Sequence, residues 1–239
     1  MSDRPPHASD PNTLLEQIST RWPLISDPGQ FVLRYAPAIR RYLGAILSDP
    51  HEADEASQDF LVKALSSGFS PERVTRGRFR DYLKAAVRNA AITRFRRRRH
   101  SAGEDALDAV AAPDDVQAEA DRAWLAEWRG CLLDRVWQSL EMHERRTAGN
   151  CFYSAVRLAT DDPKADSPTL AARLSEKKGR PVTPEAYRQQ LSRGRRQFAA
   201  LLIDEVKRTI EQPTKQAVLD ELSELGLMPF VKPYLKADG

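Results

Sequence analysis

The sequence is poor in the residues that mark several common classes of protein. Only two cysteines, Cys131 and Cys151, occur among 239 residues, and they do not form a short-spaced pair. We therefore expect a reduced, cytoplasmic protein in which both thiols are small core residues. The four histidines are scattered along the chain, so the sequence predicts no metal site.

Long apolar runs are missing as well. The first residues, MSDRPPHASDPN, contain no apolar core of the kind found in signal peptides. No segment approaches the roughly 20 apolar residues of a membrane span. The sequence also lacks a glycine loop that could cradle phosphate, clustered metal ligands and a nucleophile–base motif. We therefore expect no membrane contact, no cofactor and no catalytic activity.

The residues that are present favour helices and a polyanionic partner. With 11 glycines and no sustained alternation of β-branched residues, the chain is predicted to be all-α. The formal net charge is only +3, yet the basic residues are concentrated in a few segments. Such a charge distribution fits a partner such as nucleic acid.

The stretch from Gly77 to Arg99 combines an apolar helical stripe with many cations. The residues at helical spacing are Phe79, Tyr82, Leu83, Ala86, Val87 and Ala90. The cations are Arg78, Arg80, Lys84, Arg88, Arg94 and Arg96 to Arg99. A solvated face and the helix dipole explain one or two of these cations. Four consecutive arginines exceed that need, so we expect a contact with nucleic acid or another polyanion.

Prolines and turn residues divide the first part of the chain. Residues 1–27 form an N-terminal extension, with a short amphipathic helix expected from Leu14 to Trp22. A helix from about Pro28 to Leu47 follows, and Pro37 should kink or split it. The next helix, HEADEASQDFLVKAL, carries its acids early, as the helix dipole favours. A loop from Ser66 to Pro71 then leads into the basic helix.

An acidic stretch separates two predicted domains. Between Ser101 and Asp121 there is no Lys or Arg, whereas Asp and Glu recur among alanines. We predict a linker over residues 101–118, a first domain over 28–100 and a second over 119–210. Residues 211–239 form a C-terminal extension.

The second part is again predicted to be helical. An aromatic-rich stripe runs from Trp124 to Leu140, and a further helix is expected from about Glu144 to Leu158. Its predicted buried residues are Phe152, Val156 and Leu158. Asp161-Asp162-Pro163 should end it.

Two capped helices then make a helix-turn-helix candidate. Ser167 and Thr183 each precede a proline, as residues that cap a helix often do, and a turn at Gly179-Arg180-Pro181 separates the two helices. The second helix is predicted to expose Arg188, Gln189, Ser192, Arg193, Arg195 and Arg196. These polar and cationic residues favour DNA binding.

The C-terminal extension has one apolar face. Thr214 should cap a helix that Gly226 closes. The apolar residues are Val218, Leu219, Leu222 and Leu225. Because such a face is unusual in water, we expect it to fold back onto the second domain; a docking surface for a regulator is the alternative.

This organisation resembles bacterial sigma factors of the extracytoplasmic-function (ECF) type, in which region 2 is followed by region 4. EADEASQDFLVKAL lies without gaps on the family pattern DAEDLVQETFLRAW, although Ala56, Ser57 and Phe60 depart from it. FRDYLKAAVRNAAITRFRRRR resembles FRAWLYRIARNLAIDHLRRRR, and YRQQLSRGRRQF parallels VKSRLHRARRAL. The length and the C-terminal extension are similar to those of planctomycete-type groups.

The resemblance implies a non-catalytic protein with two kinds of partner, core RNA polymerase and promoter DNA, and a regulator such as an anti-sigma factor as a further one. It assigns core-polymerase binding to Asp54, Glu55, Gln58, Asp59, Val62 and Lys63. It assigns the minus-10 element, including an extruded base of the non-template strand, to Phe69, Arg73, Arg76, Arg78, Arg80, Arg88, Asn89, Arg96 and Arg97. It assigns the duplex minus-35 element to Thr183, Glu185, Arg188, Gln189, Ser192, Arg193 and Arg196.

Other interpretations stay open at this point. Phe69 is equally well explained as a core anchor of its loop, and Tyr82 suits the core better than base stacking. A DNA-binding regulator that does not bind polymerase would also account for both basic helices, but it leaves the acidic helix unused. A nucleic-acid enzyme has little support, because no catalytic motif is present.

Overall fold

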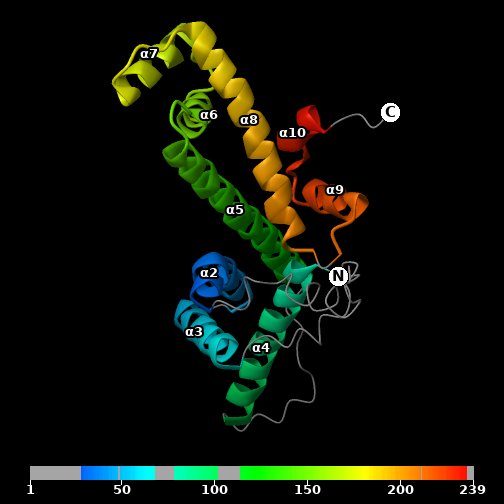
Figure 1. The fold of residues 1–239 in the computed structure, drawn as a ribbon. Helices are drawn as coiled ribbons and strands as arrows, with labels where there is room; N and C mark the ends of the chain where they lie inside the picture. The colour runs from blue at the N-terminus through cyan, green and yellow to red at the C-terminus, as the bar shows by residue number, and fades with distance from the viewer. Residues whose placement is uncertain (1–27, 48, 68–77, 102–113, 211, 236–239) are drawn as a thin grey trace, which may run out of the picture. The chain divides into compact units, whose positions relative to one another are not determined.

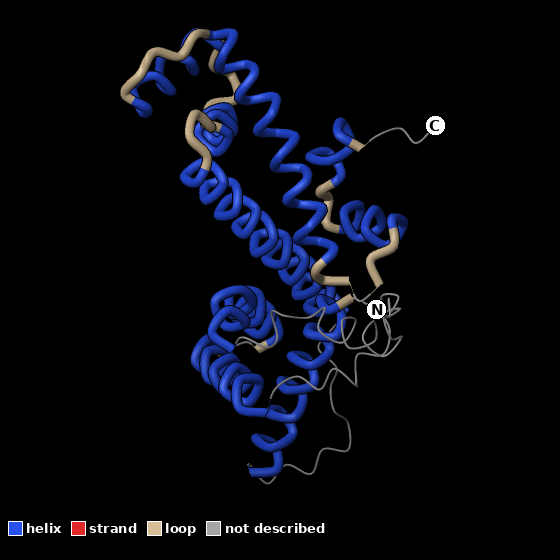
Figure 2. The backbone as a smooth tube through the Cα atoms, viewed as in Figure 1, coloured by secondary structure: helices blue, strands red, loops and turns tan. Residues whose placement is uncertain are grey.

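The structure is a computed structural model that describes residues 28–47, 49–67, 78–101, 114–210 and 212–235 (Figure 1). Throughout these ranges the regular elements are helices and no strand occurs (Figure 2), which confirms the predicted all-α class. The chain divides into two compact units, residues 1–121 and 122–239. The predicted helix from Leu14 to Trp22, most of the loop after Ser66 and residues 102–113 of the predicted linker lie outside the described residues.

The first unit is built from α2 (Pro28–Ile46), α3 (Pro50–Ser67) and α4 (Phe79–Ser101), which pack against one another. Its core lies among aromatic and aliphatic side chains of α2 and α4, and Tyr35 meets Phe79 edge to face at 5.3 Å. Pro37 does not split α2, which is continuous. The proline lies on the exposed side of the helix, where water can solvate the carbonyl that loses its partner.

The apolar stripe predicted for α4 faces this core. Phe79, Leu83 and Val87 are fully or almost fully buried, while Tyr82 is partly buried. Leu83 and Val87 are each completely inaccessible to solvent, so α4 is held by its apolar face and leaves its opposite face to solvent.

The long helix α5 (Asp114–Arg146) begins inside the range that the sequence predicted as linker. Its first turns belong to the first unit, because the Gln117 amide donates hydrogen bonds to the Tyr42 hydroxyl at 3.1 Å and to Asp121 at 2.9 Å. Lys84 of α4 pairs with the same aspartate at 3.4 Å. Residues 114–118, the last part of the predicted linker, are thus the beginning of a helix.

The second unit contains the rest of α5, α6 (Phe152–Asp161), α7 (Ser167–Lys178) and α8 (Pro184–Lys207). The prediction of a helix from Glu144 was wrong, because α5 continues to Arg146 and α6 begins only at Phe152. Gly149 between them adopts a φ of 78°, a left-handed conformation that interrupts the helix. The predicted end of α6 at Asp161 is confirmed.

Helix caps in the second unit follow the sequence with one correction. Thr183 and Thr214 accept hydrogen bonds from the backbone N–H groups of Ala186 and Ala217, both at 3.2 Å, and so cap α8 and α9 (Lys215–Glu224) as predicted. The cap of α7 is Asp166 rather than Ser167, since its carboxylate accepts from the N–H of Thr169 at 2.9 Å. A carboxylate one residue upstream thus replaces the expected hydroxyl.

The C-terminal extension packs on α8, which confirms the predicted fold-back. Helices α9 (Lys215–Glu224) and α10 (Met228–Val231) lie beside α8 in the second unit (Figure 1). A short 3-10 helix, Lys232–Tyr234, follows α10. Leu222 and Val231 are fully buried, and the Phe230 ring meets Phe198 of α8 with 6.3 Å between centroids.

Candidate functional site

The first candidate surface is the outward face of α3. Its residues Asp54, Glu55, Gln58, Asp59, Val62 and Lys63 are all exposed, and we call this set the acidic surface. Ala53, Ala56 and Ser57 on the opposite side are 5%, 5% and 1% exposed. Ala56 and Ser57, which depart from the family pattern, are thus residues that pack α3 into the unit. The structure brings all six predicted residues of the acidic surface together on one face.

Apolar side chains extend the acidic surface toward the end of α3. Val62 is 64% exposed and Leu65 is 39% exposed. Charged groups around a small apolar patch are an arrangement that suits protein–protein recognition, because charges guide the encounter and the apolar patch is buried on docking.

Arginines from the two neighbouring helices contact the carboxylates of the acidic surface. Arg40 of α2 donates from Nε and Nη2 to one oxygen of Asp54, at 3.2 and 2.7 Å. Arg94 of α4 donates to one oxygen of Asp59 at 3.0 Å and to one oxygen of Glu55. The sequence analysis did not predict these partners. The spacing of Arg94 from Val87 and Ala91, seven and three residues, is the signal that it lies on the packed side of α4.

The basic helix α4 presents some of its predicted DNA-binding residues and buries another. Arg88 and Asn89 are exposed, and Arg78 is partly buried. Arg80 is only 2% exposed, with Nη2 3.7 Å from Asp81. It precedes Leu83 and Val87 by three and seven residues, so it lies in the buried stripe rather than on the cationic face. The structure therefore removes Arg80 from the set of expected phosphate contacts.

Part of the predicted minus-10 set cannot be placed. Phe69, Arg73 and Arg76 lie outside the described residues. Arg96 and Arg97 belong to α4, but their side chains lie outside the described part as well.

The second candidate surface lies on α8. Glu185, Arg188, Gln189, Ser192, Arg193 and Arg196 are exposed and line one open depression, and we call this set the recognition surface. Thr183, also predicted, caps the helix next to it. Arg188 pairs with Glu185 at 2.8 Å. The backbone amide of Glu185 and the Arg188 guanidinium hold the pKa of the Glu185 carboxyl below its usual value.

The recognition surface is supported from behind by close packing. Buried Tyr187 donates its hydroxyl to the carbonyl oxygen of Ala155 in α6 at 3.1 Å, and burial raises the pKa of this phenol. Gly194 lies against α6 with no room for a side chain, since an added Cβ would lie 2.8 Å from Val156 Cγ2. Trp137 of α5 meets Phe198 edge to face at 5.0 Å.

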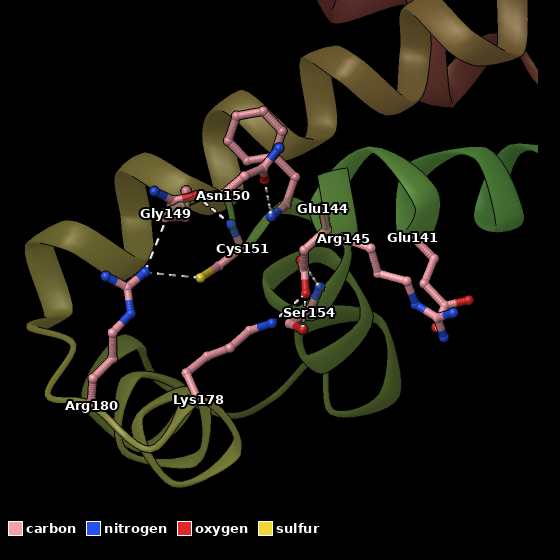
Figure 3. A network of polar contacts seen from close by, with 11 residues as sticks. Glu141, Glu144, Arg145, Gly149, Asn150, Cys151, Ser154, Lys178 and Arg180 are labelled. Atoms are coloured by element: carbon pink, nitrogen blue, oxygen red, sulfur yellow. Dashed lines mark hydrogen bonds and ion pairs between the residues drawn. The ribbon is translucent and has the colours of Figure 1, made fainter. Parts of the chain in front are cut away.

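A polar network fixes the start of α6 to the ends of α5 and α7 (Figure 3). The Glu144 carboxylate accepts from the backbone N–H of Ser154 at 2.8 Å, from its hydroxyl at 2.7 Å, and from the Lys178 ammonium. Burial by itself would raise the pKa of Glu144, but the hydrogen bonds from Lys178 and Ser154 outweigh it and lower that pKa. One ionised carboxylate thus connects α5, α6 and α7.

Two further side chains, from α8 and from the turn before it, contact the backbone at the start of α6. The Gln190 side-chain oxygen accepts from the N–H of Cys151 at 3.0 Å. Arg180 donates to the carbonyl oxygen of Gly149 at 3.4 Å (Figure 3). These contacts tie α8 and the turn before it to the start of α6. The recognition surface is therefore presented on a rigid element.

Other classes of site find no support in the described part of the chain. No three side chains of His, Cys, Asp or Glu come together there in a way that could hold a metal ion. Among the helices that the structure describes, none combines the length and the apolar character needed to cross a membrane.

Comparison with known proteins gives one match, which lies in the first unit. No curated protein and no solved structure matches the chain. Residues 31–101 match the family model described as Sigma-70 region 2. This segment covers α3, α4 and all but the first turn of α2, and hence the acidic surface and the basic helix. The match therefore supports a sigma-70 family sigma factor, with its region 2 in residues 31–101.

Proposed function

We propose that this chain is a non-catalytic sigma factor of the ECF type, of a planctomycete-like group, that binds core RNA polymerase in the cytoplasm and directs it to promoters. The region 2 match over residues 31–101 is the observation that carries this proposal. The match supports binding of core polymerase and of promoter DNA. The roles of individual residues in these contacts are our own inference.

The acidic surface of α3 is the proposed polymerase contact. Its carboxylates are exposed beside Val62, so a cationic partner surface with an apolar centre fits it. Removal of these charges should weaken binding to the polymerase without unfolding the unit, because the carboxylates are not part of the core.

The outward face of α4 is the proposed minus-10 contact. Exposed Arg88 and Asn89 lie on the side opposite the buried stripe. Arginine is suited to phosphate, and asparagine to the edge of an adenine base. Arg78, which directly precedes α4 and is partly buried, belongs to the same proposal, whereas Phe69, Arg73, Arg76, Arg96 and Arg97 stay predictions from the sequence.

The second unit is the proposed region 4, which binds duplex DNA at the minus-35 element. Helix α8 follows α7 after a short turn and exposes Arg188, Gln189 and Arg193 on one face. A helix of this kind, supported by a second helix, fits the major groove. Because the carboxylate of Glu185 is ionised and lies next to Arg188, this pair can accept and donate hydrogen bonds at base edges.

Run-off transcription with purified core polymerase on genomic fragments tests the proposal. We expect specific transcripts only when both the core enzyme and this protein are present. Co-purification with core polymerase should accompany them. Binding to duplex DNA without polymerase binding and without transcripts would instead indicate a helix-turn-helix regulator that acts alone.

A further inference from the structure

The carboxylates of the acidic surface are not loose side chains, because arginines of the two flanking helices hold them. Arg94 reaches from α4 to Glu55 and Asp59, which stand four residues apart on α3. Arg40 reaches from α2 to Asp54 at 2.7 Å. Two of the carboxylates of α3 are thus held by α4, and the third is held by α2.

The arginines occupy one oxygen of each carboxylate, and the other oxygen of Glu55, Oε1, lies 3.8 Å from Nδ1 of the exposed His51. Arg94 uses Oε2 of Glu55 and Oδ2 of Asp59, and Arg40 uses Oδ1 of Asp54. A carboxylate has two oxygens and about four lone-pair sites. The side chains of Asp54, Glu55 and Asp59 stay 55%, 55% and 79% exposed. The arginines therefore fix the direction of the carboxylates without covering them.

Arg94 differs in position from the cations proposed to meet DNA. Its side chain is 31% exposed, whereas Arg88 lies on the exposed face of the same helix. Arg94 follows buried Val87 and Ala91 by seven and three residues, so it continues the packed stripe toward α3. Its planar fork of donors can bridge two acceptors, which a lysine ammonium on a flexible stem does less well.

We propose that Arg94, assisted by Arg40, is a positioning residue for polymerase binding: it pre-orients Glu55 and Asp59 so that their outer oxygens receive the polymerase's cations. Binding then does not have to order these side chains, and that ordering cost is one that weakens protein–protein association. This inference rests on the proposed polymerase contact of the acidic surface.

The test measures the affinity of the full-length protein for core polymerase in the absence of DNA, together with the melting temperature of each variant. Arg94→Met should weaken binding about five- to tenfold, and Arg94→Lys should fall between Met and the wild type. Both variants should melt close to the wild-type temperature, because partly exposed ion pairs contribute little to stability. The difference between wild type and Arg94→Met should shrink as salt is raised.

Arg41→Met is the matched control, since it also removes one arginine charge from the first unit. Arg41 is exposed and follows Arg40 directly, which turns it about 100° away around α2. The affinity of the Arg41→Met variant for polymerase should stay within about twofold of that of the wild type.

The outcomes separate this inference from the proposed function. If the wild-type protein does not bind core polymerase, the proposed function itself fails. If the wild type binds and Arg94→Met binds equally well, only the positioning role is overturned. Equal weakening in the Lys and Met variants, with lowered melting temperatures in both, would also overturn it in favour of a structural role. If Arg94→Met does not fold, Arg40→Met takes its place, with a two- to fivefold loss expected through Asp54.

Discussion

Gly194 of α8 and Val156 of α6 are so close that a Cβ on the glycine would lie 2.8 Å from Val156 Cγ2 and 3.0 Å from the carbonyl oxygen of Phe152. Helices α6 and α8 can approach this closely only because residue 194 has no side chain. Ser192 and Arg193 of the recognition surface lie in the same turn of α8 and are exposed. The position of the recognition surface thus depends on a contact that none of its proposed DNA-binding residues makes.

We therefore expect Gly194→Ala to destabilise the protein by about 1–3 kcal/mol, because the methyl group forces α6 and α8 apart. Denaturant unfolding measures this change. Gly130→Ala is the control, since a Cβ there meets nothing within 4 Å, and it should be neutral or stabilise α5 by up to about 1 kcal/mol. A Gly194→Ala protein as stable as the wild type would contradict the close-packing argument.

A second prediction concerns pH and Glu144. Its folded pKa lies below the usual 4.5, so its stabilising effect is present at neutral pH and is lost as the pH falls through the folded pKa. Glu144→Gln should cost about 1.5–3 kcal/mol at pH 7, where hydrogen bonds to a charged group are lost. The difference between the variant and the wild type should become smaller near pH 4 and below.

Urea unfolding at several pH values checks this behaviour. Glu141→Gln is the matched control, because Glu141 pairs with Arg145 in an exposed i,i+4 contact, and it should cost no more than about 0.5 kcal/mol. A difference between Glu144→Gln and wild type that stays constant from pH 7 to pH 3 would show that the ionised carboxylate is not the stabilising form.

A third prediction concerns the acidic surface. Neutralising Asp54, Glu55 and Asp59 together, to Asn, Gln and Asn, should weaken core-polymerase binding at least tenfold, because the charge pairs across the interface are lost. Amides are preferable to lysines here, since lysines would face Arg40 and Arg94. Pull-down with core enzyme and circular dichroism measure binding and folding.

The control for this variant neutralises three exposed acids of the second unit, Glu176, Asp204 and Asp220, and changes the net charge equally. It should bind polymerase as the wild type does. Unchanged binding by the α3 variant in a folded protein would move the polymerase contact away from the acidic surface.

A fourth prediction concerns base recognition by α8. Gln189→Ala and Arg193→Ala should each weaken binding to the minus-35 element by about 1–3 kcal/mol relative to unrelated duplexes, because a hydrogen-bonded base contact is lost. Arg146→Ala, at an exposed position at the end of α5, should leave the preference for that element unchanged. Electrophoretic mobility shifts on matched and scrambled duplexes measure the ratio. Equal weakening on both duplexes would reassign Arg193 to a phosphate contact.

The last prediction concerns the C-terminal extension. Leu222→Ala should destabilise the second unit by about 2–5 kcal/mol, because this fully buried side chain packs α9 into the unit. We propose that the extension stabilises the position of α8, so the same variant should lower binding to the minus-35 element. Met142→Ala, at a side chain that is 49% exposed, is the control for thermal unfolding. Lower activity in cells with unchanged stability and DNA binding would indicate a docking surface instead.

The sequence by itself determined the features that depend on residues a few positions apart. The all-α class, the apolar stripe of α4, the caps at Thr183 and Thr214 and the end of α6 at Asp161 follow from helical periodicity and local hydrogen bonds. Other local predictions failed, among them the start of α6 and the cap of α7. At the start of α6 the left-handed residue Gly149 was overlooked, and at α7 a carboxylate one residue earlier took the place of the predicted hydroxyl.

Only the tertiary structure decided which charges are available to a partner. Arg80, Arg88 and Arg94 all lie on one basic helix. One is buried, one is exposed, and one holds the carboxylates of α3. The physical reason is that the helix period places each cation on a face, whereas what that face meets depends on helices far away in the chain. The absence of a side chain at Gly194 likewise became meaningful only once α6 was found against it.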